Sequence, residues 1–338
     1  MVSNIWEILS VICKKNIVVK SGGILQKESN EQSFMIFLVS LHTHMADYQE
    51  IDISKVIKEK SPNLFKFLPK FVLKKLTYLV HQEEINTILK KLQNKRGMEF
   101  IKGGLLELNV KSNSIGFEKL PKNQGIVIVA NHPLGGLDGV TLINELGKFR
   151  SDIKFLVNDI LTEIKPFQPF FVPINKHGLN SRKNLNSIDE LYQSKKCIVI
   201  FPAGLVSRKE KGVIKDLEWK KSFITKAKKY NLPIYPVHVS GKNSERFYNT
   251  SYWRKKIGIK LNLEMFLLAD EMFKQKSNTI NFTLGKPILP EQLNKTKTNH
   301  QWAQIIKELV YKIKNNPNFE IEHFKIKWKK SLTPYQKK

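Results

Sequence analysis

Hydrophobic and polar positions follow two different patterns along the chain, and the change between them lies near residue 100. Up to about residue 95, apolar residues recur at spacings of three and four, which is typical of amphipathic helices. The segment SPNLFKFLPKFVLKKLTYLV (61–80) shows this pattern, with lysines on the opposite side. We therefore predict an N-terminal helical region over residues 1–95, a second, larger domain over 96–325 and a basic tail over 326–338.

From about residue 105, short apolar runs alternate with helical patterns. Apolar runs separated by helices are typical of parallel strands that are buried on both faces. The sequence therefore predicts an α/β fold with a mostly parallel central sheet flanked by helices. We expect strands at 125–131, 153–158, 170–174, 196–202, 232–240 and 278–285, and helices at 137–148, 180–194, 217–230, 244–257 and 301–314.

The composition is that of a globular protein with a large excess of positive charge. The chain has 338 residues, of which 41% are hydrophobic and 26% charged, so it can bury a sizeable core. Its formal net charge of +27 favours anionic partners, such as an anionic membrane surface, an acidic carrier protein or nucleic acid. A nucleic-acid-binding protein would need a basic stripe interleaved with aromatic residues or a known module, and the sequence contains neither.

No apolar stretch has the length of a membrane span. The longest early run, FMIFLVSL (34–41), has about half of the ~18 residues that a span needs. The N-terminus has neither the basic region nor the cleavage site of a secretory signal. The two cysteines, Cys13 and Cys197, lie far apart, which favours a reducing compartment and no metal site. We therefore expect a cytoplasmic protein that is peripheral on the inner face of the cell membrane.

The segment IVIVANHPLGGLDG (126–139) carries the chemistry that the sequence suggests most directly. His132 lies at the end of a predicted strand, and Asp138 lies near the start of the next helix. A neutral imidazole can take a proton from a hydroxyl, and it does so better when a carboxylate stabilises the imidazolium that forms. No Ser or Cys stands beside the pair, which favours direct attack by a substrate hydroxyl. Gly135 and Gly136 allow close backbone approach, and the helix start offers amides to an oxyanion.

NHPLGGLDG resembles the first motif of the glycerolipid acyltransferases, the lysophosphatidate-acyltransferase superfamily. It is most similar to the branch with glycines between His and Asp, which contains hemolysin-like and aminolipid O-acyltransferases. The similarity covers roughly residues 100–290 and continues, in the family's order, through FFVPINKHG, IVIFPAGLVSRKEKG, DLEWKKSFITKAKKYNLPIYPVHVSG and FTLGKPI. Four ordered blocks are far more specific than one His and one Asp.

The resemblance implies an O-acyltransferase with His132 as general base and Asp138 as the residue that orients it. The donor would be a fatty acyl thioester on acyl carrier protein or coenzyme A, and the acceptor would be the hydroxyl of a lysolipid. The reaction would need no metal and no bound cofactor. Lys176, in PINKHG, stands where the family's second motif often has an Arg for the acceptor's headgroup.

The block FPAGLVSR (201–208) departs from the family's Phe-Pro-Glu-Gly block. Ala203 occupies the position of the usual Glu, and Leu205 the position where aminolipid enzymes tend to have Glu. Val206 stands where an Arg is common. The spacing from His to Asp is also one residue longer than the commonest form. These departures leave the acceptor open between lysophosphatidate and an N-acyl amino-acid lipid.

Three residues near this block are candidates for binding an anionic headgroup. Arg208 and Lys209 follow a predicted strand end, where ligands bind in parallel sheets, and both side chains suit a phosphate or carboxylate. Gly204 lets the backbone approach the ligand. The alternative is that SRKEKG forms a solvated loop. A catalytically inactive membrane-surface scaffold is a further alternative for the whole protein, and the intact His132 and Asp138 speak against it.

Overall fold

The computed structural model describes most of the chain from residue 50 onward. It covers residues 50–60, 65–66, 68–158, 161–162, 164–174, 181–258 and 262–324. The apolar run at 34–41 and the predicted basic tail over 326–338 lie outside the described residues. The division into a helical region, a second unit and a tail therefore stays a prediction.

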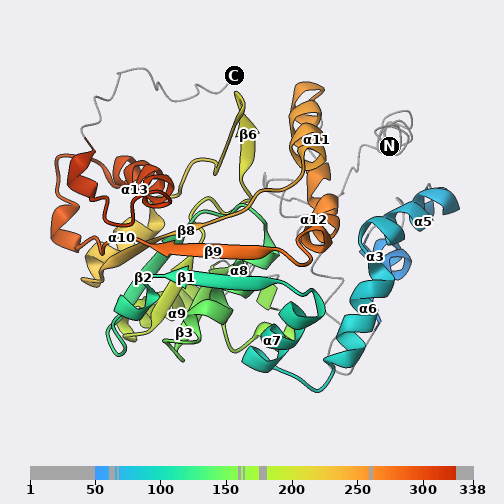
Figure 1. Cartoon of the computed structure of the whole chain (residues 1–338), viewed down its shortest axis with the longest axis horizontal. Coiled ribbons are helices and arrows are strands. Elements are labelled where there is room, and N and C mark those ends of the chain that lie inside the picture. Colours follow the sequence, from blue (N-terminus) through green and yellow to red (C-terminus); the bar gives the residue numbers. More distant parts are fainter. Residues whose placement is uncertain are drawn as a thin grey trace.

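A seven-stranded sheet forms the centre of the molecule (Figure 1). Its spatial order is β1-β9-β8-β2-β5-β3-β4. β2, β3, β4, β5 and β8 run parallel to one another, whereas β9 is antiparallel to β8 and parallel to β1. The predicted α/β fold with a mostly parallel sheet is confirmed. The strands are Lys111–Ile115 (β1), Ile126–Ala130 (β2), Ile153–Val157 (β3), Phe171–Pro173 (β4), Cys197–Ile200 (β5), Ile234–Val239 (β8) and Thr279–Leu284 (β9).

The central strands form where branched apolar residues suit a position buried on both faces. Every residue of β2 and of β5 is buried. Because successive side chains of a strand point to opposite faces, Ile126 and Ile128 join one core, whereas Val127 and Val129 join another. The predicted strands all form, each within two residues of its expected ends.

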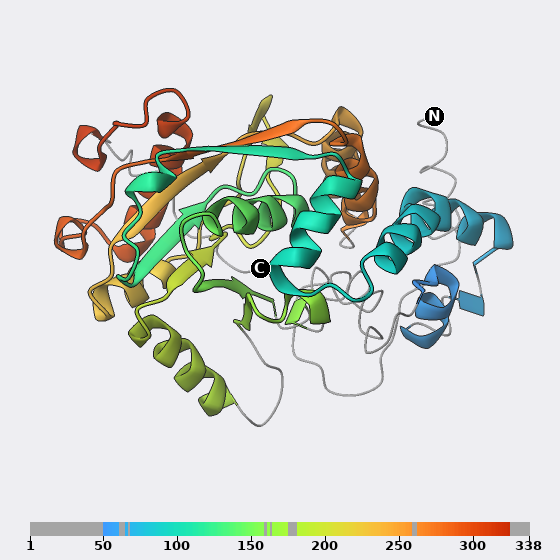
Figure 2. The same ribbon diagram turned by 60° about the horizontal axis from the view of Figure 1, so that its bottom comes forward.

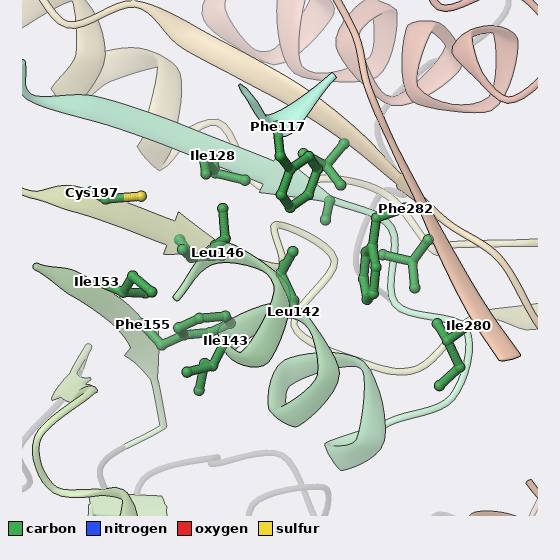
Figure 3. Packing of buried hydrophobic residues seen from close by; sticks show 14 of the residues in the cluster. Phe117, Ile128, Leu142, Ile143, Leu146, Ile153, Phe155, Cys197, Ile280 and Phe282 are labelled. Atoms are coloured by element: carbon green, nitrogen blue, oxygen red, sulfur yellow. The ribbon is translucent and has the colours of Figure 1, made fainter. Parts of the chain in front are cut away.

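Helices cover both faces of the sheet (Figures 1 and 2). α7 and α8 pack on one face, where Leu142 and Leu146 contact the core shown in Figure 3. α9, α10 and α13 pack on the other face. The helices are Ile53–Lys60 (α3), Lys70–Leu79 (α5), Gln82–Lys91 (α6), Gly97–Glu107 (α7), Gly136–Leu146 (α8), Ser181–Gln193 (α9), Ser222–Lys229 (α10), Glu245–Lys256 (α11), Leu268–Lys274 (α12) and Asn299–Ile313 (α13).

The helices α3, α5 and α6 form a smaller apolar cluster beside the sheet (Figure 1, blue to cyan). Their buried side chains include Ile53, Val72 and Leu89. Phe167 and Ala269 pack against this cluster, so it contacts the rest of the molecule through the turn at Lys165–Phe167 and through α12. Within the described ranges, no helix is both long and apolar enough to cross a membrane.

A two-stranded hairpin is the main element that the apolar pattern does not predict. β6 (Arg208–Glu210) pairs antiparallel with β7 (Val213–Lys215) in a hairpin that includes most of the charged segment SRKEKG, for which a solvated loop is the alternative that the sequence leaves open. The turn residues Lys211 and Gly212 have φ values of 49° and 81°. Two positive φ angles in a two-residue turn are typical of the type I′ turn, whose twist matches the flanking strands.

Candidate active site

His132 and Asp138 lie on either side of the turn that joins β2 to α8. β2 ends at Ala130, and α8 begins at Gly136. The Nδ1 atom of His132 lies 3.0 Å from Oδ2 of Asp138. The structure thus brings together the two side chains that the sequence paired, while their catalytic role stays a prediction.

Three N–H groups fix the carboxylate of Asp138. In addition to the His132 ring, Oδ2 accepts hydrogen bonds from the amides of Leu134 at 2.8 Å and Gly135 at 3.2 Å. Asp138 lies in the first turn of α8, where backbone amides lack partners within the helix. Its Oδ1 atom is buried and has no hydrogen-bond partner within the described part of the chain. The carboxylate is therefore held in one orientation toward the imidazole.

The electrostatics of Asp138 set the tautomer of the imidazole. Burial raises the pKa of the Asp138 carboxyl above its ordinary value, although the contacts with His132 and with the Leu134 amide oppose the rise. Because Oδ2 already accepts two backbone N–H groups, it is an acceptor toward the ring as well, which places the proton of His132 on Nδ1. The neutral ring then presents a lone pair at Nε2, which is the nitrogen that can take a proton from a hydroxyl.

A phenylalanine from the neighbouring strand sets the plane of the imidazole. The rings of His132 and Phe201 stack with centroids 4.2 Å apart and planes 17° apart. Phe201 directly follows β5, which pairs with β2. The His132 side chain is 17% exposed. The ring is thus fixed along one edge and over one face, and it keeps a route to the outside.

The hairpin holds the backbone of His132. Ser207, directly before β6, donates its amide to the His132 carbonyl at 2.8 Å. Asp216, directly after β7, accepts the His132 amide at 3.1 Å and the Ser207 hydroxyl at 2.6 Å through Oδ1. Its Oδ2 atom accepts the indole N–H of Trp219 at 2.9 Å. The role of Asp216 cannot be seen in the sequence, because its link to His132 spans 84 residues.

An apolar cavity of about 330 Å³ lies beside the turn that carries His132 and Asp138. Leu134 and Gly136 line it, on either side of the Gly135 amide that binds Asp138. The other walls come from the N-terminal helices, from α7 and α8, and from α12. Its volume is at the lower end of the ~300–1,000 Å³ that is usual for ligand pockets. The cavity can therefore hold an apolar group beside this turn.

Comparison with known proteins places this arrangement in a family. A family model described as acyltransferase matches residues 55–319, which is more than half of the chain. The chain belongs to this acyltransferase family. The match confirms the resemblance to glycerolipid acyltransferases that the sequence motifs indicate.

Two similar proteins have names that agree with this family. The lyso-glycine lipid O-acyltransferase of Phocaeicola vulgatus is 44% identical over 264 residues, which cover 78% of this chain and 95% of that protein. The protein of the same name from Bacteroides thetaiotaomicron is 43% identical over 264 residues, which cover 78% of this chain and 97% of that protein. The present chain is therefore an O-acyltransferase of lipid biosynthesis.

A solved structure of a related activity is also similar. It is the 1-acyl-sn-glycerophosphate acyltransferase of Thermotoga maritima, with 17% sequence identity and a TM-score of 0.42. The similarity covers 84% of this chain and 98% of the other.

Gly135 and Gly136 of the acyltransferase differ in their surroundings. Gly135 has a φ of 82°, which favours glycine, and a Cβ there would lie 3.4 Å from Leu268 and Val206. Its amide is bound to Asp138. Gly136 begins α8, and a Cβ there would contact nothing within 4 Å. The Gly135 amide is thus already bound by Asp138, and the oxyanion role predicted for the two glycines stays a prediction.

Arg208 of the acyltransferase lies in a buried ion pair. Its side chain is 3% exposed, and its Nη2 atom lies 3.1 Å from Oε1 of Glu264. Arg254 binds the same carboxylate at 2.7 Å. Although burial opposes it, the guanidinium groups of Arg254 and Arg208 hold the pKa of Glu264 below its ordinary value. Arg208 thus joins the hairpin to the segment before α12, and its predicted headgroup role stays a prediction.

Two of the remaining predicted headgroup residues, Lys209 and Gly204, lie within the described part of the chain. Lys209 is 33% exposed and forms an ion pair with Glu245 at 2.7 Å. Gly204 is exposed and has a φ of 67°, with Lys220 Nζ 3.5 Å from the position of a Cβ. Lys176 lies outside the described residues.

Proposed function

We propose that the acyltransferase transfers a fatty acyl group from an acyl thioester to the hydroxyl of a lyso-glycine lipid. The observation that carries this proposal is the 44% identity to a lyso-glycine lipid O-acyltransferase over 95% of that protein's length. The FPAG block supports it as well, because Ala203 is buried and apolar where the family usually has a Glu. An N-acyl glycine presents a carboxylate rather than a phosphate monoester, so it does not need the family's usual headgroup block.

In the proposed reaction, Nε2 of His132 takes the proton of the acceptor hydroxyl while the oxygen attacks the thioester carbonyl. The new C–O bond forms and the carbonyl oxygen becomes an oxyanion, which the amides in the first turn of α8 can stabilise. The C–S bond then breaks, and the imidazolium returns its proton to the thiolate. Asp138 stabilises the imidazolium between these steps.

The side chains around the site support direct transfer rather than an acyl-enzyme. The hydroxyl of Ser207 is buried and donates to Asp216 at 2.6 Å. Cys197 is buried within β5, and burial raises the pKa of its thiol to about 12. A thiol with so high a pKa is a poor nucleophile, because the thiolate is the reactive form.

The apolar cavity supports the acyl part of the proposal. Its walls are almost entirely aliphatic or aromatic, and Leu134 and Gly136, which line it, belong to the segment between His132 and Asp138. Each buried methylene of a fatty chain contributes about 0.8 kcal/mol. We propose that the acyl chain of the donor occupies this cavity, so that its thioester carbonyl lies beside His132.

The donor, the site of action and the lack of a cofactor complete the proposal. The acyl group arrives on acyl carrier protein or coenzyme A, and the enzyme works on the inner face of the cell membrane, where its net charge of +27 favours anionic lipid. The reaction uses no metal and no bound cofactor.

The acceptor is tested by steady-state kinetics with the purified full-length chain. One acyl thioester is offered with lyso-glycine lipid or with lysophosphatidate, dispersed in the same detergent. We expect kcat/KM to be about 10² times higher for lyso-glycine lipid, because a headgroup of the wrong charge and shape leaves polar groups unpaired. Lipid profiling after gene deletion should show accumulated monoacyl glycine lipid. A preference for lysophosphatidate, or its accumulation in the deletion strain, would contradict the proposal.

A further inference from the structure

The hairpin and the last turns of α11 project from the same side of the sheet (Figures 1 and 2). Lys255 of α11 lies 3.8 Å from Glu210 of the hairpin, which links the two elements. Both ends of the hairpin are bound to the candidate active site, because Ser207 and Asp216 hydrogen-bond to the backbone of His132. Whatever this projection, formed by the hairpin and the last turns of α11, contacts is therefore brought close to the imidazole.

Large apolar side chains are exposed on this projection. Val213, beside the hairpin turn, is 54% exposed. On α11, Tyr252, Trp253 and Ile257 are 55%, 45% and 48% exposed. Trp253 and Ile257 are four residues apart and so share a helix face. The rings of Tyr252 and Trp253 lie 5.4 Å apart, centre to centre, so the three side chains lie together, while Phe247 is buried. Exposed clusters of this kind mark interaction surfaces.

Lysines surround the apolar side chains. Lys211 in the hairpin turn and Lys255 and Lys256 on α11 are all exposed. Nζ of Lys256 lies 4.8 Å from the centre of the Trp253 ring. Aromatic rings at the level of lipid headgroups, with lysines that bind anionic lipid, are typical of a protein surface at a bilayer interface.

The positive charge of this surface favours a bilayer over a second copy of the chain as its partner. A second copy would place the same lysines opposite one another, and like charges across an interface oppose association. An anionic bilayer instead offers negative headgroups to the lysines and an apolar interior to the aromatic and aliphatic side chains. The combination therefore fits an anionic membrane.

We propose that Val213, Tyr252, Trp253 and Ile257, with the lysines around them, form the surface by which the acyltransferase docks on an anionic bilayer. This docking surface rests on the proposed function, since the acceptor lysolipid is held in a bilayer. Each strand residue extends the chain by ~3.3 Å, so the hairpin tip lies ~10 Å from its ends at His132. A lysolipid whose tail stays in the bilayer can then present its hydroxyl to the imidazole.

Vesicle binding by the full-length chain tests the docking surface. The apolar variant carries Val213→Ser, Trp253→Ser and Ile257→Ser, and the charge variant carries Lys211→Gln, Lys255→Gln and Lys256→Gln. The matched control carries Ile115→Ser and Leu289→Ser, two residues that are 59% and 49% exposed. Ile115 ends β1, which runs opposite to β2, and Leu289 follows the bridge to the first residue of β8. Both therefore lie at the end of the sheet away from His132.

Partition is measured by co-sedimentation with phosphatidylcholine vesicles, with and without phosphatidylglycerol. We expect the apolar variant to bind both kinds of vesicle about tenfold less tightly than the control. The charge variant should lose most of the preference for phosphatidylglycerol, because each interfacial lysine contributes a factor of about five. Equal binding by the two variants and the control would overturn the proposal. So would a change from dimer to monomer in the apolar variant with unchanged vesicle binding, which would assign the surface to a second copy.

A fluorescent label reports the orientation directly. Val213→Cys, in a Cys13→Ser background, is labelled with a polarity-sensitive dye, while Cys197 is buried and its thiol stays unreactive. We expect a blue shift on addition of anionic vesicles, and no shift for the same dye at Ile115→Cys. A label at position 213 that stays in water would overturn the proposal. These measurements involve no turnover, so the acyl-transfer assay in detergent tests the proposed function separately.

Discussion

At the scale of single residues, the site depends on a carboxylate that is isolated from water. Asp138 is completely buried, and the three N–H groups that Oδ2 accepts are all provided within its own turn. Burial alone would favour the neutral acid. A positive imidazolium beside the carboxylate reverses that preference, so the pair is most stable at the moment when His132 holds the extra proton.

Asp138→Asn tests the charge of this carboxylate while keeping its shape. The amide oxygen of Asn can still accept backbone N–H groups, but it cannot compensate the charge of the imidazolium. We expect kcat to fall by about 10²–10⁴. Circular dichroism should show an unchanged fold and a similar melting temperature. A rate close to that of the unmodified enzyme would mean that Asp138 has only a structural role.

At the scale of elements, the β6–β7 hairpin is hydrogen-bonded to the end of β2. Asp216 connects the end of β7 to His132 at the end of β2, and it also receives the indole of Trp219, which is fully buried. Its backbone amide donates to the hydroxyl of Tyr311 on α13 at 2.8 Å. A single residue, through its carboxylate and its backbone amide, thus joins the hairpin, the central sheet and the helix layer behind it.

The variant Asp216→Asn should expose this coupling. One oxygen becomes an NH2 group, which would face the Trp219 indole N–H and leave a buried donor without an acceptor. We expect a loss of ~1–3 kcal/mol in the free energy of unfolding, measured with urea. Trp219→Phe removes the indole donor, so Asp216→Asn should cost less when it is made in that background. Additive costs in this double-mutant cycle would show that the two side chains are not coupled.

The elements that can be predicted from the sequence are those whose structure is decided by the local pattern of apolar residues. β2 and β5 are recognisable because their residues are apolar without interruption, as burial on both faces requires. β1, with the sequence KSNSI, has no apolar run and forms because β9 provides a parallel partner. The hairpin likewise has charged strands, and its position depends on contacts of Ser207 and Asp216 with a distant residue.

The same distinction holds within the site. His132 and Asp138 are six residues apart, so their contact follows from one strand-turn-helix connection. Arg208 looks like a surface cation in the sequence, and only the fold shows the Glu264 carboxylate that lies 56 residues further on. Its burial could not be read from a run of charged neighbours, because long-range pairing decides it.

At the scale of the whole molecule, distant parts of the chain build the apolar cavity. The N-terminal helices, the turn before α8, the segment around Phe167 and α12 each provide walls. The N-terminal helices are thereby tied to the active site through the cavity rather than through a direct contact with His132. A change in a helix far from His132 in sequence can therefore alter which donors the enzyme accepts.

Gly104→Leu tests this connection. Gly104 lines the cavity from α7, and a Cβ there would meet only Leu92, at 4.0 Å. A leucine should fit without strain and fill the space of a few methylenes. Because each methylene contributes ~0.8 kcal/mol, kcat/KM for long acyl thioesters should fall about tenfold relative to shorter ones. Gly104→Ala is the matched control and should change the chain-length profile little. An unchanged profile for Gly104→Leu would place the acyl chain elsewhere.

The catalytic role of His132 is tested most directly by the turnover of His132→Ala. The purified variant and the unmodified chain are compared at saturating acyl thioester and lyso-glycine lipid in detergent, with circular dichroism to establish an unchanged fold. We expect kcat to fall by ~10²-fold or more, as the loss of a general base requires. A folded His132→Ala enzyme that transfers acyl groups at the unmodified rate would contradict the assignment of His132 as the base.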